Sequence, residues 1–173
     1  MKLFKNISIV IVLLFIGFWI WYEYTYSMDT VIPFQVNDPN LETKVLIASQ
    51  GSRFKDSLVQ RVLKYYKEDA IYFKVIDVYT LFTVPIDKWD AIVIINSWEY
   101  GSPPSNVKRY IKNHPEDLDR LIILSTVGSS HITLQDVDVI SGESIIEKLP
   151  EYTNEVVHRL DKILSNLKTD HNE

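Results

Sequence analysis

The stretch from Val45 to Leu63, VLIASQGSRFKDSLVQRVL, constrains the fold more than any other part of the chain. It opens with a continuous apolar run, Val45 to Ala48, which is typical of parallel strands covered on both faces. A polar loop follows, and Ser52 can cap a helix with apolar residues at every fourth position from Phe54 to Tyr66. This arrangement directs backbone N–H groups above the strand, where an anion such as phosphate can bind. An ordinary serine-capped turn without a ligand explains the same residues.

Apolar strand patterns and helical patterns alternate along the rest of the chain. Predicted strands cover 45–48, 71–78, 90–96, 120–125 and 137–140, and predicted helices cover 53–66, 105–114 and 151–167. This alternation predicts an α/β fold, a three-layer, doubly wound sheet of five parallel strands. Ligands bind such sheets beyond the carboxyl ends of the strands, and polar loops follow the first, third and fourth predicted strands.

The start of the chain is apolar and uncharged from Ile7 to Tyr22, which predicts an N-terminal transmembrane helix ending in an aromatic interfacial belt. A cleaved signal peptide is the alternative, but the following residues offer no small-residue cleavage site. Lys2 and Lys5 precede this segment, and no lysine or arginine follows it until Lys44. The positive-inside rule therefore places the N-terminus in the cytoplasm and the domain outside the cell membrane. A domain facing the cytoplasm is the alternative orientation.

These patterns predict four parts along the chain. Residues 1–27 form a membrane anchor, 28–43 an extended tether, 44–168 the α/β domain, and 169–173 a tail. Pro33 and Pro39 interrupt the tether, which has no sustained hydrophobic period.

Composition excludes several classes of function. The formal net charge is −5 and lysines and arginines do not cluster, which argues against binding to nucleic acid. The absence of cysteine excludes disulfides and thiolate chemistry. The histidines are widely separated, and none has a second histidine or a carboxylate at ligand spacing, so no metal site is expected.

Two loops carry a resemblance to a known family. Residues 51–57, GSRFKDS, are close to a G-S-x-R-x-x-S pattern, with Arg53 one place early. Residues 99–104, EYGSPP, followed by Lys108, are close to an E-Y-x-G-S-x-P pattern with one residue missing. The chain from 44 to 167 thus resembles the flavodoxin-like superfamily, especially its NAD(P)H-dependent FMN reductase and quinone reductase branch.

The resemblance implies FMN as the cofactor, and because the flavin itself transfers electrons or hydride, no catalytic acid or base is required. The implied FMN site has three parts. Ser49, Gly51, Ser52, Arg53, Phe54 and Ser57 would surround the phosphate; Trp98, Glu99, Tyr100 and Gly101 would lie beside the isoalloxazine ring; Thr126, Gly128 and Ser129 would lie on its other side. Hydroxyls at a helix start suit a dianion, and flat aromatic side chains suit a flat ring.

Two functions remain as alternatives. The first is a membrane-anchored FMN protein for electron transfer or quinone or flavin reduction, which contacts membrane lipid and a quinone or protein redox partner. If its domain lies outside the cytoplasm, the reductant is a quinol or a protein rather than NAD(P)H. The second is a cofactor-free interaction module of a membrane or envelope complex. Only the short stretch from Thr126 to Asp136 separates the fourth and fifth predicted strands, where the family has a full helix.

Overall fold

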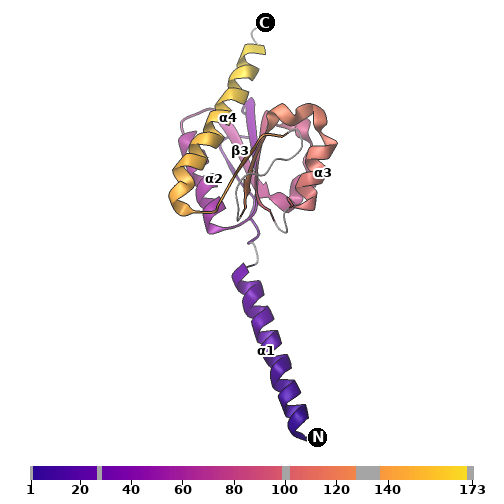
Figure 1. Ribbon diagram of the computed structural model, residues 1–173. Helices are drawn as coiled ribbons and strands as arrows, with labels where there is room; N and C mark the ends of the chain where they lie inside the picture. The colour runs from indigo at the N-terminus through magenta and orange to yellow at the C-terminus, as the bar shows by residue number, and fades with distance from the viewer. Residues whose placement is uncertain (1, 27–28, 99–101, 128–136, 171–173) are drawn as a thin grey trace.

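The computed structural model describes residues 2–26, 29–98, 102–127 and 137–170. A long helix, α1 (Lys2–Tyr26), precedes the α/β domain and extends away from it (Figure 1). The helices of the domain are α2 (Arg53–Tyr65), α3 (Ser105–Asn113) and α4 (Leu149–Asp170), with short 3-10 helices η1 (Val78–Thr83), η2 (Ile86–Lys88), η3 (Pro115–Arg120) and η4 (Ile146–Lys148).

The strands form one six-stranded sheet in the order β1-β3-β2-β4-β5-β6. They are β1 (Phe34–Val36), β2 (Thr43–Ser49), β3 (Ile71–Asp77), β4 (Ala91–Ser97), β5 (Leu121–Thr126) and β6 (Val139–Gly142). All neighbours pair in parallel except β1, which pairs antiparallel with β3. Counted alone, the five parallel strands have the order 2-1-3-4-5, which is the flavodoxin-like order.

The prediction of five strands is wrong by one, because β1 lies within the residues expected to form an extended tether. Phe34 and Val36 lie opposite Val75 and Phe73 of β3. Asn37 then turns the chain with a φ of 68°, a left-handed conformation that asparagine tolerates, and its amide donates to the carbonyl of Ile71 at 2.7 Å. Three residues are too few to show a strand period, so the sequence pattern does not predict β1.

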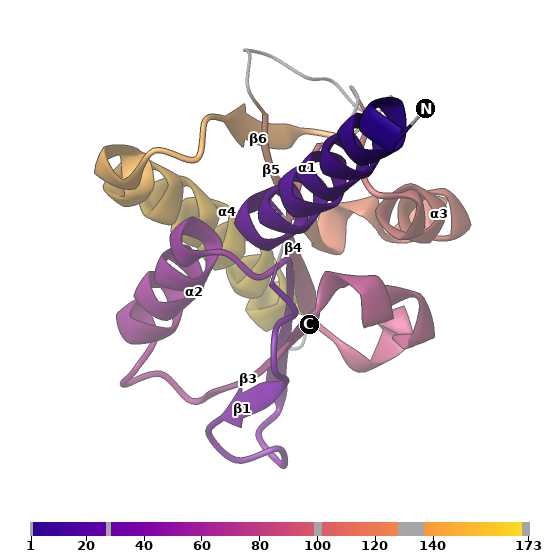
Figure 2. The same cartoon turned by 90° about the horizontal axis from the view of Figure 1, so that it is seen from below.

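Helices cover both faces of the sheet, which confirms the three-layer, doubly wound arrangement. Viewed from below, α2 and α4 lie on one side of the sheet and α3 lies on the other (Figure 2). Val45 and Ile47 of β2 belong to the core cluster of α2 and α4, whereas Leu46 and Ala48 belong to that of α3 and η1. The alternation explains why the strand is apolar at successive positions.

Within the part of the chain that the structure describes, no helix is long and apolar enough to cross a membrane. The predicted transmembrane helix is therefore not found among these residues. The predicted positions of α2 and α3 are confirmed within two residues. The fourth helix starts earlier than predicted, at Leu149, and β6 is shifted toward the C-terminus relative to the prediction of 137–140.

Tyr66 connects α2 to α4 and makes stability sensitive to alkaline pH. Its hydroxyl donates to Oδ1 of Asp161 at 2.7 Å. Burial raises the pKa of Tyr66, and the hydrogen bond and charge of Asp161 raise it further. Because the folded pKa lies above the unfolded value of about 10, this stabilisation is complete below about pH 10 and is lost as the pH rises above it.

We expect Tyr66→Phe to lower the free energy of unfolding by about 1 kcal/mol at pH 8 and to reduce its decline between pH 8 and 11. Urea unfolding of the full chain at several pH values measures both effects. Tyr65→Phe is the comparison variant, because Tyr65 is 59% exposed and is a lesser cause of the raised pKa of Tyr66 than Asp161, so it should change the decline by less. An equal alkaline decline in wild type and Tyr66→Phe would contradict the role given to this hydroxyl.

Candidate functional site

Hydrogen bonds join the carboxyl ends of the central strands. The backbone N–H of Gln50 donates to the carbonyl of Ile95 at 3.0 Å, and the side-chain oxygen of Gln50 accepts from the N–H of Ser97. The hydroxyls of Ser97 and Thr126 lie 2.8 Å apart, and the N–H of Trp98 donates to the Thr126 carbonyl at 3.0 Å. The ends of β2, β4 and β5 therefore form one network.

Gln50 extends this network to the segment after β3. Its side chain is fully buried, and its Nε2 donates to the hydroxyl of Tyr79 in η1 at 3.3 Å. Through one amide, Gln50 thus links the loop after β2 to the segments after β3 and β4. A buried polar group of this kind positions loops because leaving either partner unpaired costs free energy.

Three buried polar atoms near this edge have no hydrogen-bond partner among the described residues. They are Nδ2 of Asn96, Nε1 of Trp98 and Oδ1 of Asn106. Asn96 is 0% exposed and uses its side-chain oxygen to accept from the hydroxyl of Ser125 at 2.9 Å. Buried polar groups are nearly always paired, so the two donors at the end of β4 are candidates for binding a water or a ligand.

The loop after β2 uses its own donors within the protein. The N–H of Gly51 donates to the carbonyl of Asp29 at 2.8 Å, and the N–H of Lys55 donates to the hydroxyl of Ser52 at 3.3 Å. A hydrogen bond with the backbone of Ser52 lowers the pKa of Asp56. Most of the groups that would bind a phosphate here already have a partner.

The partner of Gly51 belongs to the segment before β1. Asp29 and Gly51 form an isolated antiparallel bridge, and the N–H of Val31 donates to Oδ2 of Asp77 at 2.9 Å. A Cβ atom built on Gly51 would lie 2.1 Å from the carbonyl oxygen of Asp29. Only glycine at position 51 allows these two segments of the chain to approach this closely.

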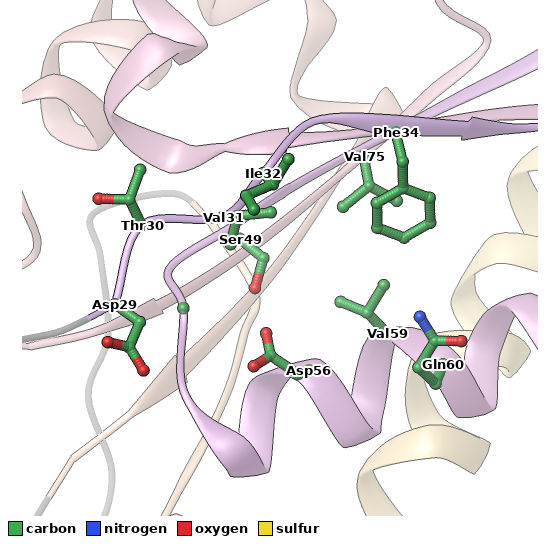
Figure 3. Close-up of a pocket in the computed structure, with 11 residues that line it drawn as sticks. Asp29, Thr30, Val31, Ile32, Phe34, Ser49, Asp56, Val59, Gln60 and Val75 are labelled. Atoms are coloured by element: carbon green, nitrogen blue, oxygen red, sulfur yellow. The ribbon is translucent and has the colours of Figure 1, made fainter.

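A cavity of about 280 Å³ lies between this segment, α2 and the β3 edge of the sheet (Figure 3). Asp29 and Asp56 contribute carboxylates to its lining, and none of the described residues that line it is a lysine or an arginine. Burial raises the pKa of Asp56, and the charge of Asp29 adds to this rise; the hydrogen bond from Ser52 and the charge of Lys55 oppose it. The carboxylates of Asp29 and Asp56 therefore disfavour an anion in this cavity, while the charge of Lys55 in the first turn of α2 acts in the opposite direction.

The other residues predicted around the phosphate are placed differently. Ser49 is buried and donates to the carbonyl of Gln50 at 3.0 Å, and Ser57 donates to the carbonyl of Arg53 at 2.7 Å. Phe54 packs edge-on against Tyr152 in the core, with ring centroids 5.7 Å apart. The side chain of Arg53 is exposed at the start of α2.

Of the predicted ring contacts, the structure describes Trp98 and Thr126 and brings them together through the backbone hydrogen bond given above. The remaining predicted contacts lie outside the described residues. They are Glu99, Tyr100, Gly101, Gly128 and Ser129.

Several residues at this edge were not predicted. Asp29 is distant in sequence, and Gln50 looked like an ordinary loop residue. Lys55 is buried in the first turn of α2 although it stands among polar residues in the sequence. The only available signal was the position of Gln50 directly after a strand, where loop side chains meet at the carboxyl edge.

Comparisons with known proteins add little to this geometry. No protein-family model and no curated protein sequence matches the chain. Among solved structures, a flavodoxin from the domain Archaea is similar, with 13% sequence identity and a TM-score of 0.46 over 70% of this chain and 99% of that chain. The fold assignment made here depends on the strand order, and the resemblance to NAD(P)H-dependent reductases is not shown by these comparisons.

Proposed function

We propose that this chain is a membrane-attached flavodoxin-like protein that binds FMN at the carboxyl edge of its sheet and takes part in electron transfer or quinone reduction. The observation that carries the proposal is the pair of buried, unpaired donors at the end of β4, on Asn96 and Trp98. They lie where doubly wound sheets bind their ligands.

The residues at this edge fit the ring of a flavin. A flavin ring is flat and presents carbonyl and ring-nitrogen acceptors along one edge, and Asn96 and Trp98 have donors to offer them. The indole of Trp98 also provides a flat apolar surface, and the paired hydroxyls of Ser97 and Thr126 lie nearby. When bound, the flavin supplies the electron transfer, and the protein's task is to bind and orient it.

Attachment to a membrane is proposed from the surface of α1. Its apolar side chains are exposed throughout the described part, including Leu14 at 69%, Phe15 at 72% and Trp19 at 71%. A continuous exposed apolar surface of this size is typical of a site that binds a membrane or another protein. An extracytoplasmic domain, with the cytoplasmic side as the alternative, would follow from Lys2 and Lys5 only if residues beyond the described apolar part extend α1 across the membrane.

The proposed site lies close to the attachment. Tyr26 ends α1, and Asp29, three residues later, contacts Gly51 in the first loop. Three residues span at most about 11 Å, so the carboxyl edge lies near the end of α1. A lipid-soluble quinone or a membrane-bound redox protein is therefore the proposed partner.

The absorption spectrum of the full chain, purified in detergent and titrated with FMN, tests the proposal. We expect a bound-flavin spectrum, and we expect Trp98→Phe to weaken FMN binding by up to about tenfold because it removes one donor and keeps an aromatic ring. Trp89→Phe is the control, since Trp89 stacks on Tyr72 before β4 begins. A protein that binds no FMN at any accessible concentration would refute this function.

The alternative is a cofactor-free interaction module. It is favoured by the loop after β2, where Asp29 and Asp56 occupy donors that a phosphate would need. On this alternative, the chain remains colourless and its partner is a protein of the same membrane.

A further inference from the structure

We propose that residues 29–34, here termed the strap, close the first loop to phosphate, so that the site discriminates flavins by whether they carry one. With the strap in place, the site favours a flavin ring without its phosphate over FMN; displacement of the strap admits the phosphate. The inference depends on the proposed flavin function and adds that the strap controls which flavin binds.

The strap occupies the first loop through specific contacts. The Asp29 carbonyl accepts from the N–H of Gly51. Without the strap, this N–H would be available to a phosphate. The N–H of Val31 is held by Asp77 at 2.9 Å, and β1 holds the far end of the strap against β3. These contacts fix the strap at both ends.

Electrostatics oppose a phosphate while the strap is bound. The strap brings the carboxylate of Asp29 to the cavity that Asp56 also lines (Figure 3). A flavin phosphate carries a charge of about −1.5 to −2 at pH 7, so both carboxylates repel it, against the attraction of Lys55 in the first turn of α2. When the strap leaves, Asp29 departs and the Gly51 N–H becomes available at the start of α2, where anions are favoured.

Gly51 offers a direct test, because the Cβ of alanine would lie 2.1 Å from the Asp29 carbonyl oxygen and force the strap away. We expect Gly51→Ala to tighten FMN binding by about tenfold or more and to change riboflavin binding by less than about twofold. Val31→Pro, which removes the N–H donated to Asp77, should act in the same direction with a smaller effect. Gly17→Ala is the matched control, since its Cβ would meet nothing within 4 Å.

Fluorescence titration of the full chain in detergent with FMN and with riboflavin measures both affinities. Hydrogen exchange of peptides covering residues 29–34 measures strap release without any ligand, and it should rise in both variants. If FMN and riboflavin bind but the variants release the strap without changing the ratio of the two affinities, the strap has no control over phosphate and the inference is overturned. If no protein binds either flavin, the proposed function itself fails and the role of the strap fails with it.

Discussion

Gln50→Leu is expected to destabilise the domain by about 1–3 kcal/mol and to weaken flavin binding at least tenfold. Gln50 is fully buried, its side-chain oxygen accepts from the N–H of Ser97, and its nitrogen donates to Tyr79. Leucine has a similar size but can pair with neither group. The N–H of Ser97 would then be buried without a partner directly before Trp98.

Urea unfolding and FMN titration of the full chain measure the two effects separately. Gln60→Leu is the matched control, because Gln60 is exposed on α2 and should change stability by less than about 0.5 kcal/mol. Loss of stability without loss of flavin binding would mean that Gln50 stabilises the fold but does not contribute to the binding site. Unchanged stability would contradict the hydrogen-bond network described at the carboxyl edge.

The second large effect is expected at α1. If α1 attaches the protein to a membrane as proposed, replacing both Leu13 and Leu14 with lysine should move the protein from the membrane fraction to the supernatant. Each leucine contributes about 1.5–3 kcal/mol of apolar burial, so the pair changes the partition by roughly 10²- to 10⁴-fold. Both side chains are exposed in the structure, so the folded domain should not change.

Fractionation of cells that express the two proteins, followed by detection of the chain in each fraction, measures this partition. Asn113→Lys with Asn154→Lys adds the same charge at exposed positions of the domain and should leave the protein in the membrane fraction. A lysine-substituted α1 that still sediments with membranes would show that another part of the chain attaches it.

The sequence predicted the parallel part of the fold because that part has strong local signals. The apolar runs of β2 and β4 are buried on both faces, and both patterns indicate central strands. The strand β1 gave no such signal, because its pairing with β3 depends on a turn at Asn37 and on contacts between segments far apart in the chain.

The candidate site was predictable only in its location. Carboxyl ends of parallel strands meet at one edge, so the meeting of the loops after Ser49, Ser97 and Thr126 follows from the fold. The hydrogen-bond partners of individual atoms do not follow from the fold. Whether the Gly51 N–H serves a ligand or the Asp29 carbonyl is decided by tertiary packing, and neither residue type nor spacing carries that information.

The short strand β1 has a consequence for solubility. Strand β3 is rich in aromatic and β-branched residues, and an open edge on such a strand can template pairing between molecules. β1 covers this edge with three residues, and Pro33, which has no N–H to donate, directly precedes it. Another molecule thus meets a short edge that begins after a proline, which makes strand pairing between molecules less favourable at this side of the sheet.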